Sequence, residues 1–435
     1  MSFILGVDTG GTYTDAVILE DEERVIAFSK ALTTHSDLSL GIGSAIQKAV
    51  KQRNTAPEKI SLVSLSTTLA TNALVEGQGD RVALIMIGFK DSDLEKHSIF
   101  DALKGDPFLV IEGGHNYAGF EKNPLEKNKL SRWISEIKCV SAYAVCSQFA
   151  VRNPEHELEA AKIIRKLTNK PVSLSHQISA KLNGPKRALT AVLNARLIAL
   201  IDVLIIKAEH VIKSLGILAP LMVVRGDGAL ISAAQAREKP IETILSGPAA
   251  SIVGARWLTG ETEAIISDIG GTTTDIAVLK GGKPAIDPRG ASVGPYRTMV
   301  EAVAMYTFGL GGDSEVKLGL EGLGGDISLG PKRVIPVALA ASIEPDLIHQ
   351  TLDSQLKNET PKDFDARFIR RTRASTEPVL SKRDDKVYRR IGEQFYPMSE
   401  VVKSRLDLQS VITVSYTHLR AHETDSYLVC RLLLE

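Results

Sequence analysis

Apolar and polar residues alternate along the first part of the chain with the spacing of short strands. Residues 3–30 predict three strands joined by turns, and an apolar run flanks each side of the turn-rich segment 6–15. Strands and helices then alternate, which favours an α/β fold. The further elements expected there are a helix at 40–50, strands at 60–66 and 82–87, a helix at 125–137, a strand at 140–146 and a helix at 154–167.

The second part of the chain begins with a long helical pattern from 187 to 214, which ends at Gly216. A strand at 221–224, a helix at 233–236 and two strands around 264–279 follow. Beyond about residue 344 the sequence is charged and helical. A chain of 435 residues exceeds the usual size of one core. We therefore expect domains at 1–185 and 186–345, a helical appendage at 346–413 and a non-native tail at 414–435.

Composition excludes some classes of partner. Lys+Arg and Asp+Glu are both 52, so net charge gives no reason to expect nucleic acid or an anionic membrane. The three cysteines are an odd number and lack metal-ligand spacing, which fits a reducing compartment better than a secreted disulfide framework. No uninterrupted apolar run reaches the ~18 residues of a membrane span, and the N-terminus has no signal-peptide pattern. We expect a cytoplasmic protein that binds neither nucleic acid nor membrane.

An internal repeat links the two predicted domains. "VDTGGTYTDAVIL" begins at Val7 and "SDIGGTTTDIAVL" begins at Ser267, each between short apolar strands. A chance match at six fixed positions is very improbable, because each residue type makes up only about 5–7% of an average sequence. The matched positions are Asp8 and Asp268, Gly10-Gly11 and Gly270-Gly271, Thr12 and Thr272, Thr14 and Thr274, and Asp15 and Asp275.

The repeated residues suit phosphate binding. Paired glycines let backbone amides approach an anion, and threonine hydroxyls donate hydrogen bonds to phosphate oxygens. Asp8 and Asp268 are placed to hold a hydrated Mg²⁺ that bridges those phosphates. A simple hairpin turn uses the same residue types, but the duplication favours phosphate binding. The predicted nucleotide contacts are Gly10, Gly11, Thr12, Thr14, Gly270, Gly271, Thr272 and Thr273.

The two hairpins resemble the phosphate motifs of the actin, heat-shock chaperone and sugar kinase superfamily. In that superfamily, two ribonuclease H-like domains bind ATP in the cleft between them. Further blocks, in order, resemble the A-type chains of the hydantoinase/oxoprolinase family over about residues 3–345. The resemblance implies an ATP-dependent hydrolase acting on a cyclic amide such as an N-methylhydantoin or 5-oxoproline, with a hydantoinase B-type partner chain. The quoted blocks are "GVDTGGTYTD", "STTLATNALVEGQG", "LTAVLNARL", "ETILSGPAAS", "SDIGGTTTDIAVL" and "FGLGGDS".

Three of these blocks supply further candidate residues. "STTLATNALVEGQG" places Thr67, Thr68 and Asn72 after a strand, as a hinge facing nucleotide or substrate, although an ordinary helix cap has the same pattern. "ETILSGPAAS" is either an anion-binding amide cluster or a capped helix start. "FGLGGDS" resembles the family's glycine-rich loop near the active site, with Gly311 and Gly312 toward nucleotide and Asp313 toward substrate.

The sequence departs from the family just before that loop. Many members carry an acidic residue and a histidine there, where this chain has Ala304 and Tyr306. A second metal site built from this run is therefore in doubt, and Asp313 is a weak substitute. His115 and His176 lie in family-like segments, but a lone histidine is more often a surface or capping residue. Residues 414–435 resemble a translated read-through, so His418, His422 and Cys430 carry no functional argument.

The resemblance implies a mechanism in which the γ-phosphoryl group of ATP passes to the carbonyl oxygen of the cyclic amide. Asp15 or Asp275 would act as the base, and the sequence does not choose between them. Two alternatives from the same superfamily stay open. One is an actin-like, nucleotide-driven activator or assembly ATPase, and the other is a small-molecule kinase.

Overall fold

The computed structural model describes most of the 435 residues. The described residues are 2–11, 13–34, 36–53, 55–271, 273–318, 327–358, 364–371, 381–404, 406–407, 411 and 429–431. The chain divides into two compact units. Unit 1 comprises Met1–Ile266 and Ile276–Tyr306, and unit 2 comprises Ser267–Asp275 and Thr307–Glu435.

The first sheet of unit 1 contains the predicted N-terminal strands. Its order is β10-β9-β4-β1-β2-β3, with β1 antiparallel to β2 and parallel to β4. Phe3, Leu5 and Val7 of β1 are buried because alternate residues face the helix α1 side of the core. The bounds are β1 Phe3–Thr9, β2 Tyr13–Glu20, β3 Arg24–Leu32, α1 Leu38–Gln52, β4 Ile60–Thr67, β9 Leu221–Val224 and β10 Leu230–Ser232.

A second sheet in unit 1 is parallel throughout, in the order β6-β5-β7-β8. Its central strands β5 (Val82–Ile87) and β7 (Ala142–Ser147) are buried at every position, because helices cover both faces. Helices α4 and α5 pack on one face, and α7 packs on the other. The remaining bounds are β6 Phe108–Ile111, β8 Val172–Leu174, α4 Lys127–Glu136 and α5 Glu155–Thr168.

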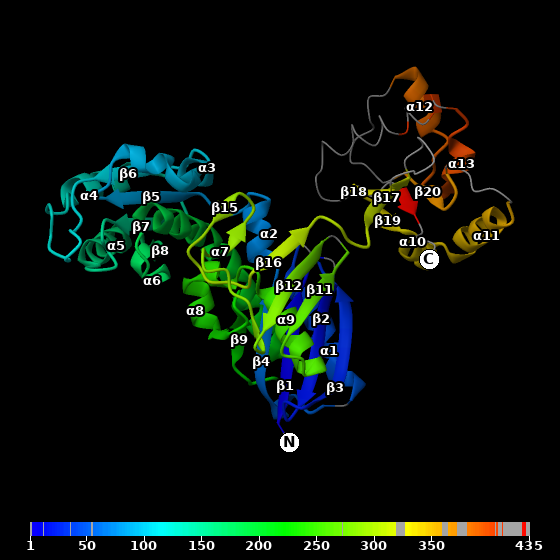
Figure 1. The fold of residues 1–435 in the computed structure, drawn as a ribbon, viewed down its shortest axis with the longest axis horizontal. Coiled ribbons are helices and arrows are strands. Elements are labelled where there is room, and N and C mark those ends of the chain that lie inside the picture. The colour runs from blue at the N-terminus through cyan, green and yellow to red at the C-terminus, as the bar shows by residue number, and fades with distance from the viewer. Residues whose placement is uncertain are drawn as a thin grey trace. The chain divides into compact units, whose positions relative to one another are not determined.

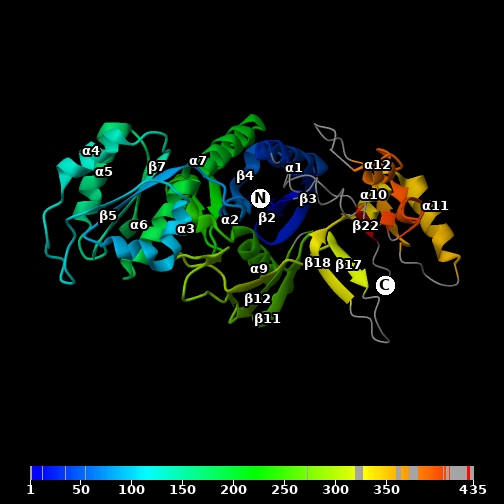
Figure 2. The ribbon, with the colours of Figure 1, turned by 90° about the horizontal axis from the view of Figure 1, so that it is seen from above.

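Helix α7 (Gly184–Ser214) joins the cores of the two sheets. Its 31 residues span about 46 Å, and it packs against α1 as well as against β7. Figures 1 and 2 both show α7 between the two sheets of unit 1. The helix has the length and mean hydropathy (2.1) of a membrane span, but 67% of that window is buried inside the protein. The high hydropathy of α7 is explained by its position in the core of unit 1.

Short elements complete unit 1 around these sheets. Helix α9 begins at Ser246, so the "LSGPAAS" segment lies at a helix start, after the 3-10 turn η3. The bounds are η1 Pro57–Lys59, α2 Leu69–Val75, η2 Asp91–Ser98, α3 Ile99–Leu103, α6 Ser175–Ile178, α8 Ala233–Glu238, η3 Pro240–Thr243, α9 Ser246–Thr259, β14 Ser292–Val293 and β15 Tyr296–Arg297.

The repeated hairpin lies in a separate sheet, which contains β11 (Ala264–Ile269), β12 (Thr274–Lys280) and β13 (Lys283–Pro284) in that order. Strand β16 (Met305–Phe308) pairs with β12. Both copies of the motif therefore form strand–turn–strand units, as the sequence predicts. The two turns are closed by the same backbone bond, from Gly10 N to Tyr13 O at 3.0 Å and from Gly270 N to Thr273 O at 2.9 Å.

The C-terminal elements of unit 2 combine helices with short strands. Strands β17 and β18 form an antiparallel hairpin, and β19-β22-β20-β21 form a second small sheet. The segment after residue 344 is therefore mixed rather than purely helical within the part that the structure describes. The bounds are β17 Ser314–Leu318, β18 Ile327–Arg333, β19 Ile335–Pro336, α10 Val337–Ile343, α11 Pro345–Leu356, β20 Arg367–Ile369, α12 Lys382–Tyr388, β21 Tyr396–Pro397, α13 Met398–Val401 and β22 Val429–Arg431.

Candidate functional site

A row of polar side chains crosses the first sheet at the level of Asp8. Asp8 is opposite Asp15 on β2 and Ser66 on β4, and Asp15 is opposite Lys30 on β3. Residues opposite one another share one face of a sheet. Lys30 Nζ lies 2.6 Å from Asp15 Oδ1, and Ser66 Oγ donates to Asp8 Oδ1 at 2.5 Å. We call these four residues the polar row.

The N-terminus of helix α9 lies beside this row. A Cβ placed on Gly247 would be 3.6 Å from Asp8 Oδ1. The hydroxyl of Ser246 donates to Thr67 O at 2.9 Å and accepts from Thr67 N at 3.2 Å, which ties the helix start to the end of β4. The first amides of a 14-residue helix favour negative charge. The N-terminus of α9 can therefore stabilise a negative charge here, either that of a phosphate or that of the Asp8 carboxylate.

The predicted hinge residues lie next to the first hairpin. Thr68 N donates to Thr9 O at 3.2 Å, and Asn72 Nδ2 donates to Thr68 Oγ1 at 3.3 Å. The Thr67 hydroxyl accepts from Leu69 N, the first amide of α2, at 3.1 Å. The block therefore lies beside the first hairpin, and its role as a hinge facing nucleotide or substrate stays a prediction.

Thr14 occupies a different environment from the one that phosphate donation needs. Its side chain is buried on the α1 side of the sheet, and its hydroxyl lies 3.0 Å from Thr33 Oγ1. Thr33 in turn donates to Gly10 O at 2.9 Å. In this structure Thr14 therefore contacts the turn through Thr33, on the face of the sheet that α1 covers. The candidates Thr12 and Thr272, which match each other in the repeat, lie outside the described residues.

The second hairpin is held by the glycine-rich loop. Gly312 N donates to Gly270 O at 3.0 Å, and Asp313 N donates to Gly271 O at 2.8 Å. Thr274 Oγ1 donates to Leu310 O at 2.7 Å. The loop that resembles the family's active-site segment therefore lies directly on the second copy of the motif, with both glycines of the hairpin in contact with it.

Asp275 has the electrostatics of a stronger base than an ordinary aspartate. Burial raises the pKa of its carboxyl group, and the negative charge of Asp268 acts in the same direction. A hydrogen bond of 2.6 Å from Thr307 Oγ1 opposes these effects without cancelling them. Asp15, by contrast, is paired with the ammonium group of Lys30. A base of raised pKa transfers protons more effectively near neutral pH, which favours Asp275.

Metal ligands are sparse in the described ranges. No group of three His, Cys, Asp or Glu side chains that could hold a metal ion occurs among these residues. Tyr306, one of the two positions where we expected a departure from the family pattern, is exposed, and Ala304 N donates to Ala285 O at 2.6 Å. Mg²⁺ bound through nucleotide phosphates needs only one or two carboxylates, and each hairpin carries one such residue, Asp8 in unit 1 and Asp268 in unit 2.

Sequence reasoning missed a buried polar network at the end of β7. Glu157 of α5 is fully buried and accepts from Ser147 N at 2.8 Å and from Ser175 Oγ at 2.6 Å. Its second oxygen lies 2.6 Å from His176 Nδ1. The buried guanidinium of Arg187 donates to Ser175 Oγ and to Ser147 O, each at 3.2 Å. An acidic residue inside a helical pattern gives no sequence signal of such burial.

His115 is also buried, contrary to the expectation of a surface or capping residue. Neither ring nitrogen has a partner among the described residues, and its ring centroid lies 4.5 Å from that of His156. His115 is buried because the chain that follows strand β6 packs against helix α5. There His156 accepts a hydrogen bond from Gly114 N at 2.8 Å.

Lowering the pH from 7.5 to 5.5 is expected to destabilise unit 1 through His115. Burial and the neighbouring His156 lower the pKa of His115, while Glu155 and Glu121 oppose this less strongly. The unfolded histidine binds a proton near pH 6.5 and the folded one does so at lower pH, so stability present above 6.5 is lost as pH falls. Urea unfolding midpoints at both pH values measure this loss.

The variant His115→Asn should show a smaller loss of stability on acidification than the parent chain. His210→Asn, at an exposed position of α7, is the matched control and should keep the parent's pH dependence. An unchanged pH dependence in His115→Asn would contradict the assignment.

Comparison with known proteins identifies the sequence. Residues 4–168 match the hydantoinase/oxoprolinase N-terminal region, and residues 187–335 match the hydantoinase/oxoprolinase family. The alpha chain of the caprolactamase of Pseudomonas jessenii is 28% identical over 75% of this chain and 50% of its own length. 5-Oxoprolinase 1 of Arabidopsis thaliana is 27% identical over 63% of this chain and 25% of its own. The chain thus spans half or less of these relatives' length.

Solved structures share the fold. The ATP-dependent caprolactamase of Pseudomonas jessenii matches with a TM-score of 0.63 at 22% identity, covering 96% of this chain and 62% of that one. A nucleotide-free acetone carboxylase matches with a TM-score of 0.64 at 21% identity, covering 76% of this chain and 51% of that one. At this identity the likeness concerns the mixed α/β fold.

Proposed function

Because this chain belongs to the hydantoinase/oxoprolinase family, we propose that it uses ATP to open a cyclic amide through a phosphorylated intermediate. The observation that carries the proposal is the duplicated hairpin. Both copies are closed by the same backbone bond, and each places an aspartate just before the paired glycines. Caprolactamase and 5-oxoprolinase, named among the relatives, act on cyclic amides, which supports the substrate class.

The proposal assigns phosphate groups of ATP to both hairpins. Backbone amides of Gly10, Gly11, Gly270 and Gly271 would donate to phosphate oxygens, and the α9 N-terminus beside Asp8 would add a favourable field. Asp8 and Asp268 would hold the waters of Mg²⁺, which when bound neutralises charge on the phosphates. The contacts between Gly311–Gly312 and the second hairpin favour a role for this loop at the same phosphates.

The proposed reaction begins when the carbonyl oxygen of the cyclic amide attacks the γ-phosphorus and ADP leaves. The product is a phosphorylated imidate, which is far more electrophilic than the amide. Water then adds to the ring carbon, the C–N bond breaks, and the nitrogen takes a proton. The resulting acyl phosphate reacts with a second water to give a carboxylate and inorganic phosphate. Asp275 is the preferred base for activating water, because its pKa is raised.

The wider organisation also belongs to the proposal. We infer two ribonuclease H-like domains of the actin-like type at 1–185 and 186–345, and the two matched regions at 4–168 and 187–335 support this division. The caprolactamase relative is named as an alpha chain, which supports a partner chain, here of the hydantoinase B type. We also propose a cytoplasmic location, because an odd number of cysteines, three, fits a reducing compartment better than a secreted disulfide framework.

Phosphate release in the presence of cyclic amides tests the function. The full chain is incubated with ATP, Mg²⁺ and a panel containing 5-oxoproline, N-methylhydantoin and simple lactams, with and without the B-type partner. We expect one ADP and one phosphate to form for each molecule of ring-opened product. Phosphorus NMR separates this outcome from a stable phosphorylated product, which would indicate a kinase. ATP turnover that no cyclic amide stimulates would favour the activator class.

A further inference from the structure

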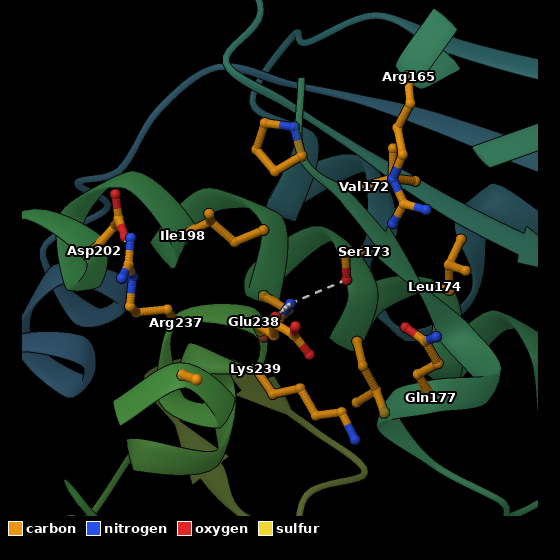
Figure 3. A pocket seen from close by; sticks show the side chains of 14 residues that line it. Arg165, Val172, Ser173, Leu174, Gln177, Ile198, Asp202, Arg237, Glu238 and Lys239 are labelled. Atoms are coloured by element: carbon orange, nitrogen blue, oxygen red, sulfur yellow. Dashed lines mark hydrogen bonds and ion pairs between the residues drawn. The ribbon is translucent and has the colours of Figure 1, made fainter. Parts of the chain in front are cut away.

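A cavity of about 610 Å³ lies in unit 1 away from both hairpins, and none of its lining residues belongs to them. It is formed by the C-terminal end of α5, by β8 with α6, by the middle of α7, and by α8 with the residues that follow it (Figure 3). Its volume is within the range of about 300–1,000 Å³ that small-molecule sites occupy.

The floor of this cavity offers one hydrogen-bond donor. Asn194 is buried and fully engaged, because its amide nitrogen donates to Ser173 Oγ at 3.1 Å and to Glu238 O at 3.2 Å, while its oxygen accepts from Ile241 N at 3.1 Å. Ser173 is also buried, and its oxygen accepts from Asn194. The hydroxyl proton of Ser173 has no acceptor among the residues that the structure describes, so it is available to a ligand.

Charged groups face the cavity from two sides. Asp202 neutralises Arg237 through an ion pair, which leaves Arg165, Lys239 and Glu238. Within the described ranges none of these three forms an ion pair. Figure 3 shows the guanidinium of Arg165 entering from the side of α5, with Glu238 and Lys239 on the side of α8. The cavity therefore presents one cationic group on the side of α5, and a carboxylate with a second cationic group on the side of α8.

Between these charges the wall is apolar. Pro171, Ile178 and Ile198 line the cavity with apolar side chains that are exposed or only partly buried. A ligand that fits this arrangement has a carboxylate at one end for Arg165, an ammonium group at the other end for Glu238, and an aliphatic chain between them.

We propose that this cavity binds an aliphatic amino acid whose amine and carboxylate are at opposite ends of the chain. Opening a simple lactam yields a molecule of this class, since the broken C–N bond leaves an amine at one end of the chain and a carboxylate at the other. The identification of the ligand as a ring-opened product rests on the proposed function. The cavity would then be a product-sensing site, separate from the residues that bind nucleotide.

Isothermal titration calorimetry on the full chain, without ATP or cyclic amide, tests the site. The probes are 5-aminopentanoate and 6-aminohexanoate, with pentanoate and pentylamine as matched ligands that lack one charge. We expect the amino acids to bind at least about tenfold more tightly than either matched ligand, because each charged hydrogen bond contributes a factor of this order. Arg165→Gln should weaken the binding of both amino acids and of pentanoate about tenfold.

Two further variants sharpen the result. Glu238→Gln should weaken the amino acids and leave pentanoate unchanged, whereas Lys166→Gln, at an exposed neighbour of Arg165 outside the cavity, should change nothing. Equal binding of pentanoate and 5-aminopentanoate, insensitivity to Arg165→Gln, or no heat of binding at millimolar ligand would each overturn the proposal. Because the measurement needs no turnover, its failure is distinct from a failure of the proposed activity.

Discussion

Asp8→Asn is expected to lower the rate of ATP hydrolysis at least about 100-fold while leaving the fold intact, because the side chain would lose the charge that organises the metal waters. The amide oxygen of the substituted side chain can still accept the hydrogen bond that Ser66 donates to Asp8 at 2.5 Å, so the polar row keeps its geometry. The measurement is steady-state phosphate release with the best cyclic amide, together with a thermal unfolding curve.

The matched control for this variant is Glu23→Gln, at the exposed turn between β2 and β3 of the same hairpin sheet. It should hydrolyse ATP at the parent rate. Asp268→Asn should reproduce the loss seen for Asp8→Asn, because the two aspartates occupy the same position of the repeat. If Asp8→Asn turned over ATP at the parent rate, the assignment of the first hairpin to phosphate would be wrong.

Glu157→Ala is expected to destabilise unit 1 by about 3–5 kcal/mol, because it leaves the buried Ser147 amide and Ser175 hydroxyl without their acceptor, at about 1–3 kcal/mol each. The carboxylate of Glu157 accepts from Ser147 N and Ser175 Oγ, and Ser175 also accepts from the buried guanidinium of Arg187. Removing the carboxylate also leaves the His176 backbone amide without the acceptor it has at 3.1 Å. Chemical unfolding monitored by circular dichroism measures the change.

Glu136→Ala, at an exposed position in the last turn of α4, is the control for this prediction. It should alter stability by less than about 0.5 kcal/mol, since surface substitutions away from special features change little. Glu157→Gln, which keeps the shape and one acceptor, should lie between the two. A loss below about 1 kcal/mol for Glu157→Ala would mean that the network contributes little to stability.

The two repeated hairpins could largely be predicted from the sequence because their turn geometry is local. Gly10 and Gly270 close their turns through bonds to residues three positions away, and such short-range geometry is encoded by the glycines themselves. The buried face of β1 was equally predictable, since alternation with period two fixes which residues point to the core.

Long-range contacts could not be predicted from the sequence, because no local pattern specifies them. Nothing in the sequence near Asp8 indicated that Lys30 would complete the polar row, or that Gly247 of α9 would lie beside the Asp8 carboxylate. The burial of His115 and Glu157 depends on where α5 packs against the second sheet, which is a property of the assembled layers. Polar residues in such places resemble surface residues until their partners are known.

The sequence by itself determined the α/β class, the duplicated hairpin and the family of this protein, because periodicity, turn residues and ordered motifs are all carried by neighbouring positions. Only the tertiary structure decided that β9 and β10, which lie beyond residue 185, complete the first sheet next to β4. It also decided that the loop at 309–314 contacts the second hairpin. Such pairings join segments distant in sequence, and burial and hydrogen bonding across the assembled fold select them.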